Sequence, residues 1–310
     1  MVTHRSLIWT LIACMLLTSC RNFASASPTP DSALDATPLP ETATPVAIDY
    51  ATLLRNAEYQ LGAVDSQQVV QLTDGKYTQG TLGGGDYMSV VVTDFMDMGE
   101  LDGSDGNEYA MLVSENYGGT GSFMFLAVYD DMDGTPKFLT SRMVDDRPKI
   151  NELSIMDTNE IYLDAVIHGF QDPMCCPTLR TTGLYRLASA GGLLMTNYTS
   201  FTPDGRERVI TIESPVEYTE VAGSVQLKGS VTIAPFENNL VYRIYDVGGV
   251  ELAIGPITVI ADELGGPGTF DQIVEFGDLL SGTAIRIEVE DQSMADGSLL
   301  AMDSVVLIVQ

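Results

Sequence analysis

Two stretches of the sequence carry side chains that could bind a metal ion or react. The first is the acidic segment "DFMDMGELDGSDGNEYAML", which contains six carboxylates: Asp94, Asp97, Glu100, Asp102, Asp105 and Glu108. Calcium takes about six to eight oxygen ligands, and flexible acidic loops rich in turn residues supply them. The segment therefore predicts a calcium site, with a solvated acidic turn as the alternative reading.

The second stretch is "HGFQDPMCCPTL", residues 168–179, in which Cys175 and Cys176 are adjacent and have a proline on either side. Adjacent cysteines pair with each other only by closing a small strained ring, a vicinal disulfide. The alternatives are two free thiols, an intermolecular or redox-active bond, or a soft-metal site. For the last of these, His168 and Met174 would join the sulfurs around Cu(I). The bracketing prolines favour a fixed structural turn that holds a vicinal disulfide.

The start of the chain predicts export. Residues 1–19 combine a short basic region with an apolar run that is too short to span a bilayer, as in a secretory signal peptide. Leu17-Thr18-Ser19-Cys20 resembles the bacterial lipobox, which implies that Cys20 receives a diacylglyceryl group and becomes the mature N-terminus. Two acyl chains suffice for a stable anchor. The expected location is the outer face of the cell membrane, in a compartment that permits disulfides.

A tether is predicted next, over residues 20–49, because Pro, Thr, Ala and Ser dominate and large apolar side chains are scarce. The whole chain has a formal net charge of −28. Such a charge repels nucleic acid and anionic headgroups, so contact with the membrane is expected through the lipid anchor only. It also favours the binding of cations, above all calcium.

The remainder of the chain predicts an all-β protein. From residue 50 to 203, segments rich in β-branched and aromatic residues alternate with turn formers, which indicates an antiparallel meander. The predicted strands are 87–95, 108–116, 122–130, 137–144, 150–157, 160–169 and 183–189. Only residues 51–61 have the pattern of a short helix. After a break at 202–208, apolar and polar residues alternate through 208–310, which is typical of a β-sandwich of roughly seven strands.

The C-terminal half resembles the immunoglobulin-like domain of bacterial spore germination, a Gmad-type domain. The resemblance rests on "IESP" at 212–215, "GSV" at 229–231, "VYRIYDVGGVELAIG", "GTF" at 268–270 and "EVEDQSMADGS". Residues 262–267, "DELGGP", depart from it where a simpler turn is expected. The resemblance implies an immunoglobulin-like sandwich without a known active site. The segment 50–203 resembles uncharacterised exported bacterial domains, which implies no activity.

Nothing in the sequence singles out a catalytic group. His168 is the one histidine that remains after cleavage of the signal, and no G-x-S-x-G motif accompanies a serine. We therefore expect a non-catalytic, lipid-anchored binding or scaffolding protein of the bacterial cell envelope, with a protein or cell-wall partner. The alternatives are a secreted hydrolase with an accessory immunoglobulin-like domain and a calcium-dependent surface adhesion module.

Overall fold

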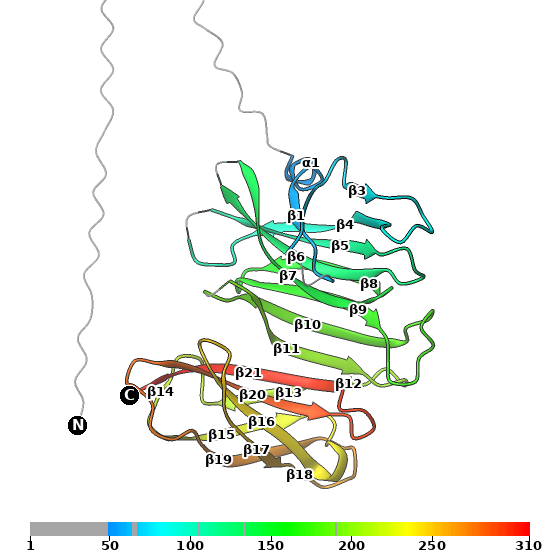
Figure 1. Ribbon diagram of the computed structural model, residues 1–310. Coiled ribbons are helices and arrows are strands. Elements are labelled where there is room, and N and C mark those ends of the chain that lie inside the picture. Colours follow the sequence, from blue (N-terminus) through cyan, green and yellow to red (C-terminus); the bar gives the residue numbers. More distant parts are fainter. Residues whose placement is uncertain (1–48, 64–66, 105, 133, 190) are drawn as a thin grey trace, which may run out of the picture. The chain divides into compact units, whose positions relative to one another are not determined.

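Alternating and fully apolar runs of β-branched residues dominate the chain after residue 50, and nearly all of them form antiparallel strands (Figure 1). The computed structural model describes residues 49–310 except 64–66, 105, 133 and 190. The predicted signal peptide, Cys20 and nearly all of the predicted tether lie outside the described residues. The all-β prediction is confirmed.

The first strands form a short hairpin and a five-stranded sheet. Helix α1 (Tyr50–Leu54) lasts five residues before the chain enters the hairpin of β1 (Glu58–Gln60) and β2 (Val69–Gln71). The sheet follows chain order, as expected for a meander, and its strands are β3 (Lys76–Gln79), β4 (Met88–Gly99), β5 (Glu108–Asn116), β6 (Phe123–Met132) and β7 (Thr135–Asp146).

A ten-stranded sheet contains strands from both halves of the sequence, with the main order β17-β16-β20-β21-β11-β10-β9-β8. From the first half come β8 (Lys149–Met156), β9 (Glu160–Ile167), β10 (Leu179–Leu187) and β11 (Leu193–Phe201), and beside β11 lies β12 (Glu207–Arg208), from the break at 202–208. From the second come β16 (Asn239–Asp246), β17 (Glu251–Thr258), β20 (Ala284–Gln292), β21 (Leu299–Val309) and the short parallel β14 (Glu220–Val221).

The two halves meet where β11 pairs with β21, with Asn197 opposite Asp303 and Thr199 opposite Ala301. Side chains reinforce the junction, since the Asn197 amide donates to Asp303 Oδ1 at 3.2 Å. The break at 202–208 contains β12, which pairs with β11, and the described residues from 49 to 310 belong to one compact unit. The division into domains at this break remains a prediction.

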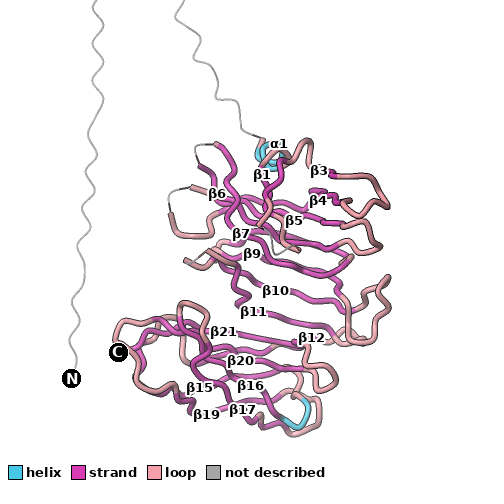
Figure 2. The backbone as a smooth tube through the Cα atoms, viewed as in Figure 1, coloured by secondary structure: helices cyan, strands magenta, loops and turns pink. Residues whose placement is uncertain are grey.

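The C-terminal sandwich is closed by a four-stranded sheet, whose strands are β13 (Ile210–Ser214), β15 (Ser224–Val231), β19 (Gly268–Glu275) and β18 (Ile260–Ala261). A one-turn 3-10 helix, η1 (Phe236–Asn238), precedes β16, and loops link the other strands (Figure 2). Inward-facing side chains of both sheets, such as Leu227, Phe270 and Ile287, form one buried cluster.

Burial explains why some strands alternate in sequence and others do not. The middle of strand β5, residues 109–113, is apolar without alternation because both of its faces are covered. Tyr109, Met111 and Val113 pack in the cluster with α1 and the β1–β2 hairpin, whereas Ala110 and Leu112 pack with residues of β9. The five-stranded sheet thus lies between the hairpin on one face and the ten-stranded sheet on the other.

Candidate functional site

The acidic loop connects β4 and β5, and it brings three of the six predicted ligands together. Glu100, Asp102 and Glu108 each place a carboxylate oxygen within 4.8 Å of the others. The loop turns tightly because carboxylates accept backbone N–H groups: Glu100 Oε1 from Asp102 and Gly103, at 2.9 and 2.5 Å. Three close carboxylates are the kind of oxygen cluster that binds a hard cation.

Glu108 is the buried member of this cluster, with 1% of its surface exposed. Burial raises the pKa of its carboxyl above the usual range. The Leu101 N–H, which donates to Oε2 at 2.6 Å, opposes this effect, whereas the negative charges of Asp102 and Glu100 add to it. A divalent cation would offset the repulsion among the three carboxylates.

The other predicted ligands are engaged elsewhere or are not described. Asp94 forms an ion pair with Arg55 at 2.6 Å. Asp97 lies on β4 and accepts the Ile155 N–H of β8 at 2.7 Å, so it connects the two sheets of the first half. Asp105 lies outside the described residues. The six carboxylates therefore do not gather as one set around the loop, because β4 continues to Gly99 and carries Asp94 and Asp97 along the strand.

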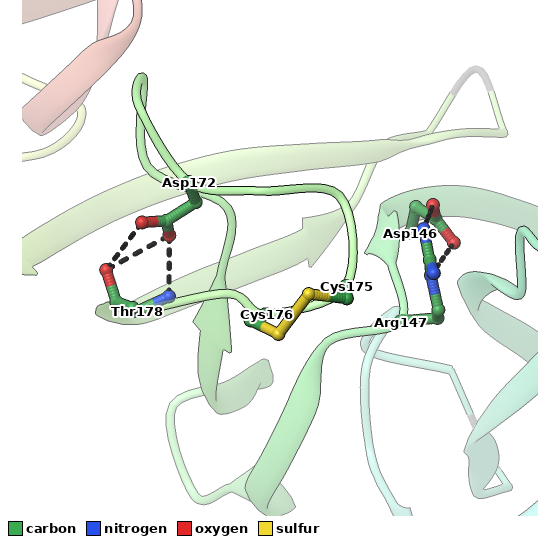
Figure 3. Close-up of a disulfide and its surroundings, with 6 residues drawn as sticks. All are labelled: Asp146, Arg147, Asp172, Cys175, Cys176 and Thr178. Atoms are coloured by element: carbon green, nitrogen blue, oxygen red, sulfur yellow. Dashed lines mark hydrogen bonds and ion pairs between the residues drawn. A yellow bond between two sulfur atoms is a disulfide. The ribbon is translucent and has the colours of Figure 1, made fainter.

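The cysteine loop connects β9 and β10, and Asp172 holds its two ends together (Figure 3). Asp172 Oδ2 accepts the backbone N–H of Gly169 at 2.8 Å and that of Thr178 at 2.6 Å, and the Thr178 hydroxyl donates to Oδ1 at 2.8 Å. These bonds, the Gly169 N–H first, lower the pKa of the Asp172 carboxyl. No prediction from the sequence included Asp172. An aspartate ahead of a proline in a turn is the signal that could have found it.

Cys175 and Cys176 form a disulfide at the tip of this loop, and both residues are exposed. The Cys176 N–H donates to the Pro173 carbonyl at 2.8 Å, which closes a turn around the pair. Beside it the Met174 side chain is 65% exposed. Sulfurs that are bonded to each other are not thiolate ligands, so this form of the loop does not supply the Cu(I) donors considered above.

His168 lies at the start of the loop and is bound to β7. Its backbone N–H and its Nδ1 both contact Asp145 Oδ2, at 2.6 and 2.8 Å. The hydrogen bond to Asp145 raises the pKa of His168, and partial burial opposes this effect. Since Nδ1 faces Asp145, the ring contributes to the attachment of the loop to the five-stranded sheet.

Strand order and the packed sheets of the C-terminal half define an immunoglobulin-like β-sandwich. Residues 209–298 match the model of a named family, Gmad2, the immunoglobulin-like domain of bacterial spore germination. The resemblance of the C-terminal half to this family is therefore confirmed. A search of curated proteins found no match to the chain. Among the described residues, no helix has the length and apolar character required to cross a membrane.

Proposed function

We propose that the protein is a lipid-anchored, non-catalytic binding or scaffolding protein on the outer face of a bacterial membrane. The observation that carries the proposal is the pairing of β11 with β21, which joins the Gmad2 sandwich to the preceding strands by backbone hydrogen bonds. An accessory domain on a linker would be free to reorient. Here the sandwich and the first half form one body, so a partner bound to the sandwich is held in a defined position relative to the first half.

The surface of the sandwich has features that suit the binding of a protein or cell-wall partner. Large apolar side chains are highly exposed on it: Ile260, Leu264, Ile273 and Leu280 at 73, 93, 64 and 83%. Strands β17 and β18 also end their sheets, and an edge strand presents unpaired backbone groups. Exposed apolar residues near strand edges are typical of surfaces that bind other molecules.

The anchor can be tested in cells that express the full chain and receive an alkyne-tagged palmitate. We expect labelling of the protein and its recovery in the membrane fraction, because a diacylated cysteine anchors stably. Cys20→Ser should abolish both, whereas Cys175→Ser with Cys176→Ser, which removes the other two cysteines of the mature chain, should leave both intact. Membrane recovery of Cys20→Ser at the level of the unaltered protein would contradict the lipid anchor.

The binding role can be tested with a photoreactive amino acid in place of Leu264 in the same cells. We expect a discrete cross-linked product at this position and none at Gln79, an exposed polar position on β3. The product is then digested with a protease or with a peptidoglycan hydrolase, which distinguishes a protein partner from cell wall. The absence of a product at Leu264, and at Ile273 as a second position, would contradict the binding role of this surface.

A calcium-dependent surface module is a second candidate, favoured by the cluster of Glu100, Asp102 and Glu108. We expect about 10 mM calcium to raise the melting temperature by roughly 2–4 °C over a chelated sample, as for a site of millimolar affinity. Glu108→Gln should remove the shift. Asp94→Asn, a loss of the same charge at a carboxylate outside the cluster, should keep it. Equal melting temperatures with and without calcium, measured by circular dichroism, would exclude the site.

A further inference from the structure

A cavity of about 450 Å³ lies between β7 and the ten-stranded sheet. Leu163 and Ala165 of β9 and Tyr198 of β11 line it, together with Arg142 of β7 and Leu299 of β21. It arises because β7 is the last strand of the five-stranded sheet, whereas the ten-stranded sheet continues past it. Its volume falls within the roughly 300–1,000 Å³ typical of small-molecule sites.

Arg142 is the exceptional charge in this cavity. Every other arginine in the described part of the chain lies within 4.0 Å of a carboxylate, namely Arg55, Arg147, Arg180, Arg186, Arg206, Arg208, Arg243 and Arg286. Arg142 has no such partner there, in a protein with 43 acidic residues. Its guanidinium lies 5.9 Å from the centre of the Tyr185 ring, and Nη1 donates to the Leu193 carbonyl at 3.3 Å.

These two contacts hold the guanidinium at the cavity and leave most of its five N–H donors free. Asp296 is the acidic residue among those that line the cavity, and its carboxylate forms hydrogen bonds within its own turn. Its Oδ1 accepts the Ser298 hydroxyl at 2.9 Å and the Ser298 N–H at 3.3 Å. A planar guanidinium without an acidic partner matches an incoming carboxylate, to which it can donate two parallel hydrogen bonds.

We propose that this cavity binds an organic carboxylate with an apolar body. The Arg142 guanidinium pairs with the carboxylate, and Leu163, Ala165 and Tyr198 contact the body. Two sources carry this chemistry, a free small carboxylic acid and the C-terminal residue of a peptide. The site goes beyond the scaffolding role proposed above and does not depend on the lipid anchor or on the exposed surface of the sandwich.

The test uses the full chain with its methionine methyl groups labelled with ¹³C, because Met143 and Met195 both line the cavity. Titration with 3-phenylpropanoate should shift these two methyl signals, with a dissociation constant on the order of 1 mM for a ligand of this size. The uncharged 3-phenylpropanamide, which has the same shape, should bind at least about tenfold more weakly, because it cannot form the charge-assisted pair.

Arg142→Gln should weaken binding of 3-phenylpropanoate about tenfold. Lys137→Gln removes the same charge from the same strand outside the cavity and should leave binding unchanged. Arg142→Lys keeps the positive charge but lacks the planar guanidinium with its paired donors. Its affinity for 3-phenylpropanoate should lie between those of Arg142→Gln and Lys137→Gln. The tripeptide Gly-Gly-Phe distinguishes the two sources of the carboxylate. If it binds more tightly than 3-phenylpropanoate, the ligand is the C-terminal residue of a peptide; if it binds more weakly, the ligand is a free carboxylic acid.

Three results would overturn the proposal: no shift of the Met143 and Met195 signals, equal affinity for the acid and the amide, or equal losses in Arg142→Gln and Lys137→Gln. The variants change exposed side chains, so all of them should fold. Unchanged signals from methionines outside the cavity confirm that a lost response reflects binding and not unfolding.

Discussion

Gly229→Ala is expected to lower the free energy of unfolding by about 3 kcal/mol, because the added methyl group has no room. Gly229 lies in the middle of β15, paired with Ile212 on one side and Phe270 on the other. A Cβ atom there would overlap the carbonyl oxygen of Thr211 and the ring of Phe270. The backbone of β13 cannot move aside without breaking its pairing, so the sandwich core must deform.

The measurement is urea unfolding followed by circular dichroism, with the midpoint and slope compared between variant and unaltered protein. Gly119→Ala is the matched control, since no atom lies within 4 Å of the position of its Cβ. A Gly229→Ala protein whose midpoint equals that of the control would show that the sheet tolerates a side chain here. The close packing deduced for this part of the Gmad2 sandwich would then be wrong.

Glu115→Ala is expected to lower the free energy of unfolding by about 3–5 kcal/mol, because each buried donor left without an acceptor costs about 1–3 kcal/mol. Glu115 is fully buried in β5. Its Oε1 accepts the Tyr59 hydroxyl at 2.6 Å and the Gly62 N–H at 2.8 Å, and its Oε2 accepts the Ala63 N–H at 3.0 Å and the Tyr117 hydroxyl at 2.6 Å. The substitution leaves four donors without their acceptor, in and beside the core under the β1–β2 hairpin.

Glu115→Gln should cost less than Glu115→Ala, because the amide oxygen still accepts on one side while the amide nitrogen opposes the donors on the other. Glu152→Gln, an exposed glutamate on β8, is the matched control and should leave the urea midpoint within experimental error. If Glu115→Ala unfolded at the same urea concentration as Glu152→Gln, the carboxylate would not hold the hairpin on the sheet.

Local patterns account for most of the strands and for the composition of both loops. Strand β5 coincides with the predicted segment 108–116, because its flanking turns and apolar run are local features. Strand β10 begins at Leu179, earlier than the predicted residue 183, because its first residues are held by pairing with β9. Strand β11 (Leu193–Phe201) was not predicted, since it is held between β10 and β21, and β21 comes from the far end of the chain.

In the candidate sites too, local features were predicted from the sequence and features that depend on folding were not. A vicinal disulfide was predicted from the adjacency of Cys175 and Cys176, because ring closure concerns only neighbouring residues. The acidic loop was found from composition, but composition could not show that Asp94 and Asp97 point to Arg55 and β8 while Glu108 is buried beside Glu100. No prediction from the sequence included Arg142, because folding decides which acidic residues lie near an arginine.

By itself, then, the sequence determined the all-β class, the Gmad-type half and the two loops in which metal or sulfur chemistry was expected, because strand patterns, turn residues and adjacent cysteines are local properties. Tertiary structure decided that both halves share one sheet, which carboxylates meet and where a cavity opens beside the Arg142 guanidinium. Each of these depends on the register between strands that are far apart in the chain, and no local pattern specifies that register.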